Sequence, residues 1–347
     1  MNSLCLLVDF LFVRSHVTLF FSAMDPAFAH QSLATSTLNK YRRLWSTFIS
    51  MATAKNLLAL PASAATFEQL VSDFASWKKS VPLTLAMVAA VNHFHSLAGF
   101  QSPSNQPRMR LILRGIKRAF SKPAKHALPL SPCIIKSAIA FLGDDLARTS
   151  HFQLPMCRWR TVAALVLSYA ALARYSCLAR LKYKHIIFSD QGMHITFPSS
   201  KTDQLNAGQS VFVSRIHGSY YCPVLILRAY TLRLQYEAFL AGNFPFSGPL
   251  FPALHRVRGV SRLKAEAFTH QGATKAMRSL LEAVGVPDPE AFTLHSGRRG
   301  GATHAALNGC DFLAIKRQGR WKSDSCPQLY IDDAYNMYNN YTSFLGL

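Results

Sequence analysis

Two side chains in the segment 293–301 (TLHSGRRGG) are suited to act together on a phosphate group. His295 and Arg298 are three residues apart, so on a helix that begins near Thr293 they project from the same face. The arginine fork can donate two hydrogen bonds to a phosphate, and the imidazole can transfer a proton near neutral pH. Three glycines in the segment weaken a helix by up to about 1 kcal/mol each, which indicates close packing against protein or against a DNA backbone. They are Gly297, Gly300 and Gly301.

A histidine and an arginine at this spacing are a weak signal alone, but four further residues follow a definite order around them. Arg174 ends the apolar stretch 161–173, and Lys201 lies in a loop between two expected strands. Trp321 and Tyr330 come after the pair and are nine positions apart. Cleavage of a phosphodiester requires that the charge on its non-bridging oxygens be neutralised in the transition state, and Arg174 and Arg298 could supply that charge.

Tyr330 could act as the nucleophile in such a cleavage. A phenol has an ordinary pKa of about 10, so attack near neutral pH needs the field of the two arginines and a nearby base. His295 is placed to assist that proton transfer as an acid or a base. Trp321 carries an indole N–H that could donate to the same phosphate, and its bulk could form a wall of the pocket; it could equally be an ordinary core residue.

The six residues in this order resemble the tyrosine recombinase (phage integrase) family. The His-Ser-x-Arg spelling and the Trp-to-Tyr spacing are similar to those of Cre-type members. The wording GRWKS before Tyr330 resembles recombinases of eukaryotic mobile elements of the Crypton and DIRS types. The resemblance extends over about residues 31–340 and rests on Arg174, Lys201, His295, Arg298, Trp321 and Tyr330.

This resemblance implies a reaction, a partner and an assembly. Tyr330 would form a 3′-phosphotyrosyl link and leave a free 5′ hydroxyl, with Lys201 protonating the departing oxygen. Because the link keeps the bond energy, rejoining needs no ATP, metal or other cofactor, and the sequence has neither a P-loop nor a carboxylate cluster. The implied partner is double-stranded DNA, bound by a homotetramer on two duplexes, in recombination or integration of a mobile element. The implied location is intracellular, and nuclear if the source is eukaryotic.

Two features leave alternatives open. Cys177 stands where family members usually carry an acid that is thought to support the arginine pair. A DNA-binding relative that has lost catalysis is therefore one alternative, and DNA relaxation like that of type IB topoisomerases, which use a similar set of residues, is another. Three further tyrosines rival Tyr330 as nucleophile: Tyr335, Tyr338 and Tyr341.

Three other residues are expected to be structural or to contact phosphate, and not to be catalytic. They are His270, Arg299 and His304.

The basic charge of the chain points to the same partner. The formal net charge is +21, and half of the 347 residues are hydrophobic, so the chain can bury cores and is not a disordered polycation. Residues 31–130 contain thirteen lysines and arginines and two acidic residues. A solvated surface normally mixes both signs, so we expect this region to bind the DNA backbone. The residues predicted to do so are Lys40, Arg42, Arg43, Arg108, Arg110, Arg114, Lys117 and Arg118.

Hydrophobic periodicity predicts the elements that position these residues. Helices are expected at 37–51, 66–78, 83–98, 108–120, 133–142, 158–178, 224–241, 261–284, 295–308, 311–318 and 327–338. Three short strands are expected at 185–189, 193–198 and 210–214. The uncharged run 161–173 is too short to span a bilayer and is predicted to be a buried core helix, which disfavours a membrane protein.

The predicted fold class is mainly α with a small antiparallel β-sheet, in two domains. A non-core extension (1–30) precedes a helical, SAM-like core-binding domain (31–120). A proline-rich linker (121–132) then leads to an α+β catalytic domain (133–347). The seven scattered cysteines include no CxxC pair, which disfavours both a disulfide framework and a structural zinc site, and no metal site is expected.

Overall fold

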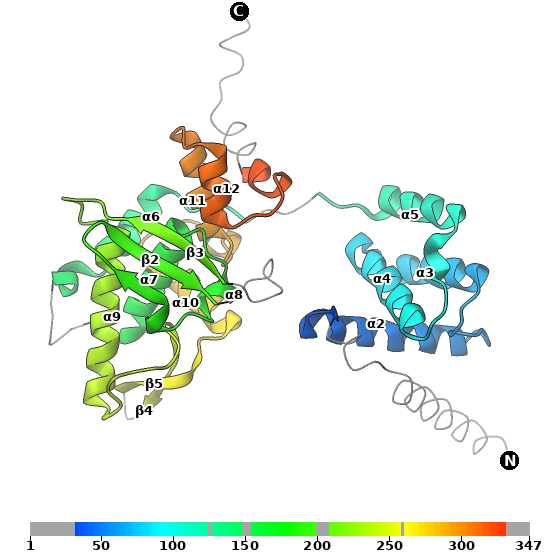
Figure 1. The fold of residues 1–347 in the computed structure, drawn as a ribbon, viewed down its shortest axis with the longest axis horizontal. Coiled ribbons are helices and arrows are strands. Elements are labelled where there is room, and N and C mark those ends of the chain that lie inside the picture. The colour runs from blue at the N-terminus through cyan, green and yellow to red at the C-terminus, as the bar shows by residue number, and fades with distance from the viewer. Residues whose placement is uncertain (1–31, 124–126, 148–153, 199–207, 258–259, 331–347) are drawn as a thin grey trace, which may run out of the picture. The chain divides into compact units, whose positions relative to one another are not determined.

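The computed structural model describes residues 32–123, 127–147, 154–198, 208–257 and 260–330 (Figure 1). The chain divides into two compact units, with the boundary between Ala124 and Lys125. This boundary falls within the stretch in which the sequence predicts a linker. The proposed N-terminal extension, residues 1–30, lies outside the described residues.

The described residues of the first unit contain four α-helices. They are α2 (Thr35–Thr53), α3 (Ala64–Lys78), α4 (Val81–Leu97) and α5 (Pro107–Phe120). Ser63 caps α3 by accepting a hydrogen bond from the Thr66 amide at 3.1 Å, and Pro107 begins α5, where its missing N–H costs nothing. The Trp45 ring stacks on Phe48 and Phe94 in the centre of the core. The basic residues therefore lie on helices that have an apolar core of their own.

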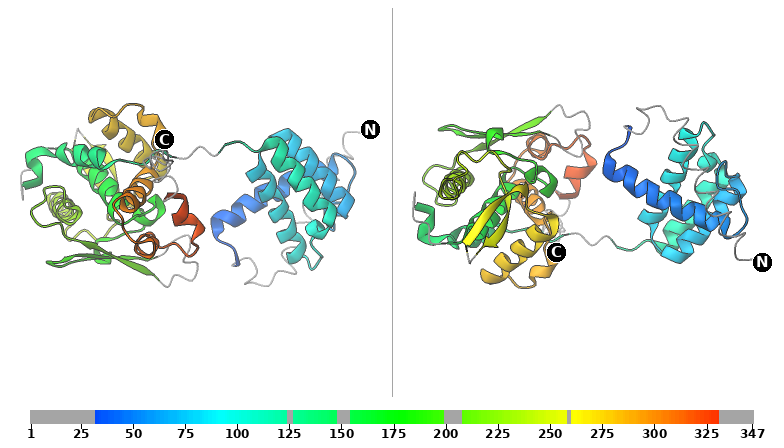
Figure 2. Two further views of the ribbon diagram at one scale, coloured as in Figure 1. Left: turned by 90° about the horizontal axis from the view of Figure 1, so that it is seen from above. Right: turned by 90° about the horizontal axis from the view of Figure 1, so that it is seen from below.

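The second unit combines helices with two small antiparallel sheets. Its main helices are α6 (Pro132–Ala140), α7 (Met156–Ala170), α8 (Tyr175–Leu178), α9 (Pro223–Leu240), α10 (His270–Ala283), α11 (Ser296–Leu307) and α12 (Phe312–Gly319). One sheet has the order β1 (Ile186–Phe188), β2 (Gly192–Phe197), β3 (Gln209–Ser214), and the other pairs β4 (Pro252–Val257) with β5 (Val260–Ala267). Both views of Figure 2 show the three-stranded sheet along one side of this unit, beside the helices. The predicted fold class is confirmed.

Helix α7 is the centre of the second unit. Its residues from Trp159 to Ser168 are all buried, and it packs against α6, α9, α10 and α11. The prediction of a buried core helix in this stretch is therefore confirmed. Arg160 of α7 donates from Nη1 to the Pro252 carbonyl at 2.7 Å, and Tyr230 of α9 donates to the Leu250 carbonyl at 2.8 Å. These two bonds fix the start of β4 against the helices.

Two expected helices differ from the structure. The helix predicted at 158–178 is interrupted: α7 ends at Ala170, and α8 starts only at Tyr175. Leu172 has a φ of 45°, in the left-handed region, and this turn breaks the helical pattern. The helix predicted at 261–284 is wrong in its first part, because this part forms strand β5. The facing pair Leu254 and Leu263 packs on the core and stabilises the hairpin.

In the part of the chain that the structure describes, no helix is both long and apolar enough to cross a bilayer. The described residues also contain no group of three or more His, Cys, Asp or Glu side chains that could hold a metal ion.

Candidate active site

The glycines near His295 pack against protein. A Cβ atom at Gly300 would lie 2.1 Å from the Leu130 carbonyl oxygen, and one at Gly301 would lie 2.2 Å from the Tyr169 carbonyl oxygen. At Gly297 it would lie 2.6 Å from the hydroxyl of Ser168. Glycine is therefore required where α11 packs against α7 and against the extended segment that precedes α6. Of the two explanations that the sequence allowed, close packing against protein is the one observed.

This packing carries Arg298 into the interior, where it is 1% exposed. Its Nη1 donates to the Leu172 carbonyl, and its Nη2 donates to the Gly319 carbonyl at 2.8 Å. The guanidinium carbon lies 4.0 Å from the centroid of the Trp321 ring, a cation–π distance. Arg298 therefore joins the turn after α7 to the end of α12.

Arg174 lies beside Arg298 at the N-terminus of α8 and is half-buried. Burial lowers the pKa of Arg298, the positive charge of Arg174 lowers it further, and the Tyr330 phenol raises it. Among the described residues, no carboxylate pairs with either arginine. Buried charge without a counter-ion is costly, so this site favours an anion such as a phosphate.

Trp321 and Tyr330 complete the surroundings of Arg298. Trp321 packs in a small apolar cluster with Leu172 and Ile315, and the centroid of its ring lies 5.5 Å from that of Tyr330. Tyr330 belongs to the helical residues 325–330 and is half-buried. The indole therefore contacts both the buried guanidinium and the phenol.

His295 lies on the outer side of the same tyrosine. It is the exposed residue before α11, so it does not share a face with the buried Arg298 as the sequence suggested. His295 and Tyr330 both line a pocket of about 530 Å³. The guanidinium carbon of Arg299, which lines the same pocket, lies 5.7 Å from the centroid of the Tyr330 ring. Tyr330 thus lies between the buried arginine and a pocket that is open to solvent.

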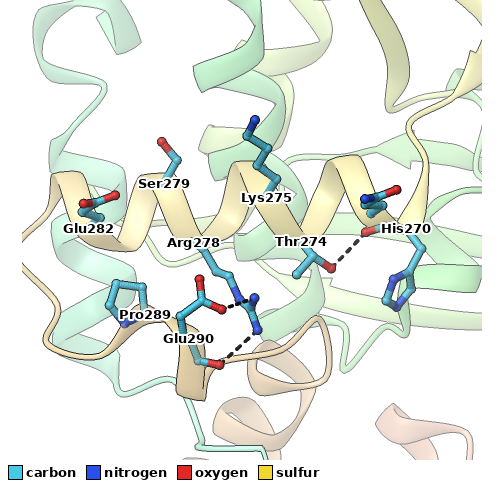
Figure 3. Close-up of a pocket in the computed structure, with 9 residues that line it drawn as sticks. His270, Thr274, Lys275, Arg278, Ser279, Glu282, Pro289 and Glu290 are labelled. Carbon is cyan, nitrogen blue, oxygen red and sulfur yellow. Dashed lines mark hydrogen bonds and ion pairs between the residues drawn. The ribbon is translucent and has the colours of Figure 1, made fainter.

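A polar groove of about 740 Å³ continues from this pocket along α10 (Figure 3). The pocket and the groove share His270, Thr274 and Arg278. Arg278 pairs with Glu290, as Figure 3 shows, and its Nη2 also donates to the Glu290 carbonyl at 3.0 Å. A ligand chain could therefore run from Tyr330 along one face of α10. The groove is lined by His270, Gln271, Thr274, Lys275, Arg278, Ser279, Glu282, Pro289 and Glu290.

The structure brings together five of the six predicted site residues: Arg174, His295, Arg298, Trp321 and Tyr330. Lys201 lies outside the described residues, and so do the rival tyrosines Tyr335, Tyr338 and Tyr341. His304 contacts the Gly300 carbonyl of its own helix through Nδ1 at 2.9 Å, a local structural contact.

Sequence reasoning missed one residue of this site, Arg320. Its side chain is buried against the same turn that Arg298 contacts. Its place between Gly319 and Trp321 was the signal that could have drawn attention to it.

Comparison with known proteins finds one similar sequence and several similar structures, but no matching family model. The chain is 27% identical over 320 residues to the "Integrase/recombinase xerD homolog" of Selenomonas ruminantium, which covers 89% of this chain and 87% of that protein.

Two solved structures share its fold. XerH site-specific recombinase bound to a palindromic difH substrate in a post-cleavage complex has a TM-score of 0.59 at 13% identity, over 89% of this chain and 80% of that one. The pre-cleavage complex with difH has a TM-score of 0.52 at 13% identity, over 88% and 78%.

The similarity to the integrase/recombinase extends over 89% of this chain and 87% of that protein. The fold is that of the XerH recombinase. In sequence and in fold the chain therefore resembles integrases and recombinases of the tyrosine recombinase type.

Proposed function

We propose that this protein cleaves and rejoins strands of double-stranded DNA through a 3′-phosphotyrosyl intermediate, in recombination or integration of a mobile element. The observation that carries the proposal is the position of Tyr330. This tyrosine contacts the Trp321 ring, and on its other side it lines an open pocket with His295 and Arg299. A nucleophile there would be reachable from solvent and would lie in the field of Arg298.

In the cleavage step, the Tyr330 oxygen attacks the scissile phosphorus, and the bond from phosphorus to the 5′ oxygen breaks. Arg174 and Arg298 neutralise the charge that develops on the non-bridging oxygens. His295 accepts the phenolic proton, and Lys201 gives a proton to the departing oxygen. In rejoining, a 5′ hydroxyl attacks the phosphotyrosyl bond and the same groups return their protons, so no cofactor is consumed.

The DNA would be gripped through its phosphates. All eight predicted DNA-binding residues of the first unit are exposed, on α2 and α5. Arg108 forms an ion pair with Glu68 at 3.2 Å, whereas the other seven have no ion pair among the described residues. In the second unit, His270, Lys275 and Arg278 of α10 would follow the strand that leaves the Tyr330 pocket. Counter-ion release at these contacts should make binding depend strongly on salt.

We also propose the remaining features that the resemblance to tyrosine recombinases suggests. The first unit would be the core-binding domain and residues 133–347 the catalytic domain. The active assembly would be a homotetramer on two duplexes, acting inside the cell, and in the nucleus if the source is eukaryotic.

A covalent trapping experiment tests the function. The full-length protein is incubated with a pool of duplexes of randomised sequence that are nicked on one strand, so that the short fragment freed by cleavage diffuses away. The mixture is denatured, and DNA that stays attached to protein is isolated and sequenced. We expect an adduct with the wild type and none with Tyr330→Phe, and the recovered DNA gives the target sequence.

Matched variants decide the nucleophile. Tyr335→Phe, Tyr338→Phe and Tyr341→Phe should each keep the adduct. If Tyr330→Phe keeps it and one of the others loses it, the nucleophile is reassigned while the function stands. If the wild type binds the pool but forms no adduct, the protein is a DNA-binding relative without catalysis. Supercoil relaxation without joined recombinant product would indicate a topoisomerase-like activity.

A further inference from the structure

Arg320 is a buried cation beside the proposed phosphate-binding arginines, and the mechanism above does not use it. It follows α12 with a φ of 55°, in the left-handed region that residues with a side chain seldom adopt. Gly319 before it accepts a hydrogen bond from Arg298, and Trp321 after it lies against the Arg298 guanidinium. Arg320 thus occupies the single position between two contacts of Arg298.

The Arg320 side chain holds the turn that precedes Arg174. Its Nη1 donates to the Ala171 carbonyl at 3.2 Å, and its Nη2 donates to the Leu172 carbonyl at 3.4 Å. The Leu172 carbonyl also accepts from Arg298, so two guanidinium groups share one acceptor. The left-handed conformation of Leu172 is part of the turn that bears these carbonyls, and Arg174 follows two residues later.

The surroundings of Arg320 keep its guanidinium in one place. The side chain is 7% exposed, and its guanidinium carbon lies 3.9 Å from the centroid of the Phe197 ring of β2. Burial lowers the pKa of the Arg320 guanidinium, and Cys177 lies close enough to raise it. Cys177 stands where family members usually have an acid. Its thiol replaces a carboxylate, so the cluster of three arginines has no acidic partner in the described part of the chain.

We propose that Arg320 is a positioning residue for DNA cleavage, which fixes through the Ala171 and Leu172 carbonyls the turn from which Arg174 reaches the scissile phosphate. This inference rests on the proposed function. The planar fork of arginine suits the task because it can reach two adjacent carbonyls while its face rests on an aromatic ring. A lysine keeps the charge but has neither the fork nor the flat face. Two carbonyls that are held by a fork on a buried ring leave Arg174 little freedom to move.

The test compares Arg320→Met and Arg320→Lys with the wild type on a nicked duplex recovered from the trapping pool. Three quantities are measured: the dissociation constant for the duplex, the single-turnover rate constant of adduct formation, and the final amount of adduct. We expect Arg320→Met to lower the rate constant at least about tenfold, since small misplacements of a catalytic group slow reactions strongly. The dissociation constant and the final amount should stay within about twofold, and Arg320→Lys should recover part of the rate.

Arg317→Met is the matched control, because Arg317 is an exposed arginine of the same helix and loses the same charge. It should react at the wild-type rate. If Arg320→Met lowers the final amount of adduct while the reacting fraction keeps the wild-type rate constant, Arg320 only stabilises the fold and the inference is wrong. It is also wrong if Arg320→Met reacts like the wild type. Absence of any adduct from the wild type would instead overturn the proposed function, and the inference with it.

Discussion

The guanidinium carbon of Arg298 lies over the indole of Trp321, 4.0 Å from its centroid, and Nη2 donates at 2.8 Å to the carbonyl of Gly319. One arginine of α11 thus holds both the ring and the backbone that lead to Tyr330. The fit is close, since a Cβ atom at Gly319 would lie 1.8 Å from the Trp321 ring. Stability and the proposed catalysis should therefore depend on the same few contacts.

Replacement of Trp321 should affect both properties. Trp321→Ala removes a side chain that is 6% exposed, and the cavity should lower the free energy of unfolding by about 3–5 kcal/mol. It should also slow adduct formation, since both Arg298 and Tyr330 lose a contact. Trp321→Phe keeps an aromatic face, so it should lower both the free energy of unfolding and the rate of adduct formation less than Trp321→Ala does. Urea unfolding and single-turnover trapping measure the two effects. Equal rates for the alanine and phenylalanine variants would contradict a role for the ring.

Gly300→Ala should destabilise the second unit. The new methyl group would meet the Leu130 carbonyl oxygen at 2.1 Å, which α11 can relieve only by moving away, at a cost of about 1–3 kcal/mol. Gly115→Ala is the control in α5, because nothing lies within 4 Å of its added Cβ. It should stabilise the helix by about 0.4–1 kcal/mol. Hydrogen exchange resolved by segment assigns each change to its unit. A neutral Gly300→Ala would show that the α11 contact is not tight.

The first unit should lose stability in mild acid because of His95. This fully buried ring contacts the Val91 carbonyl through Nδ1 at 2.8 Å and accepts from the Ala62 amide through Nε2 at 2.9 Å. Burial lowers the pKa of His95, while the Val91 bond opposes this. The unfolded chain therefore takes up a proton first as the pH falls below about 6.5, and the stability present at higher pH declines from there.

Protection of the Ala62 amide from hydrogen exchange measures this decline at pH 7.5 and pH 5.5. The exposed His217 is the control, and His217→Gln should leave the difference between the two pH values unchanged. Equal protection at both pH values in the wild type would show that protonation of His95 is not linked to folding.

Two arginines of α5 should differ in their effect on DNA binding. Arg114 is exposed without an ion pair among the described residues, so Arg114→Ala should reduce the slope of log Kd against log salt by about 0.9. Arg108 already pairs with Glu68, so Arg108→Ala should reduce it less. Fluorescence anisotropy on one labelled duplex at several salt concentrations gives both slopes. A larger reduction of this slope by Arg108→Ala than by Arg114→Ala would mean that the ion pair of Arg108 with Glu68 opens when DNA binds.

Glu290→Gln should strengthen DNA binding. The carboxylate of Glu290 pairs with Arg278 in the groove beside Tyr330, and its removal frees a cation for a phosphate (Figure 3). Glu282→Gln removes the same charge from the same groove but leaves the Arg278 pair intact, so its effect should be smaller. The affinities of the two variants for the same duplex show whether tighter binding comes from the release of Arg278 or simply from the loss of one negative charge in the groove. Equal effects would exclude release of Arg278.

The sequence by itself was enough for the helices of the first unit and for the three strands of the β1–β3 sheet, since these have clear hydrophobic periods. It also predicted the ordered site residues from Arg174 to Tyr330, because residue type and spacing are local properties of the chain. The structure brings five of the six together, and Lys201 lies outside the described residues. It misassigned residues 261–267, because a strand of a two-stranded hairpin is defined by its partner β4 and not by its own period.

The tertiary structure decided how the site is held together. The helix break at Leu172 and the burial of Arg320 depend on residues about 150 positions apart, since Arg320 bonds to the Ala171 and Leu172 carbonyls. The sequence shows that an arginine precedes Trp321, but not that its charge is buried beside Cys177. Such contacts arise only when α7, α11 and α12 pack together, because a hydrogen bond across the core requires geometry that no local pattern encodes.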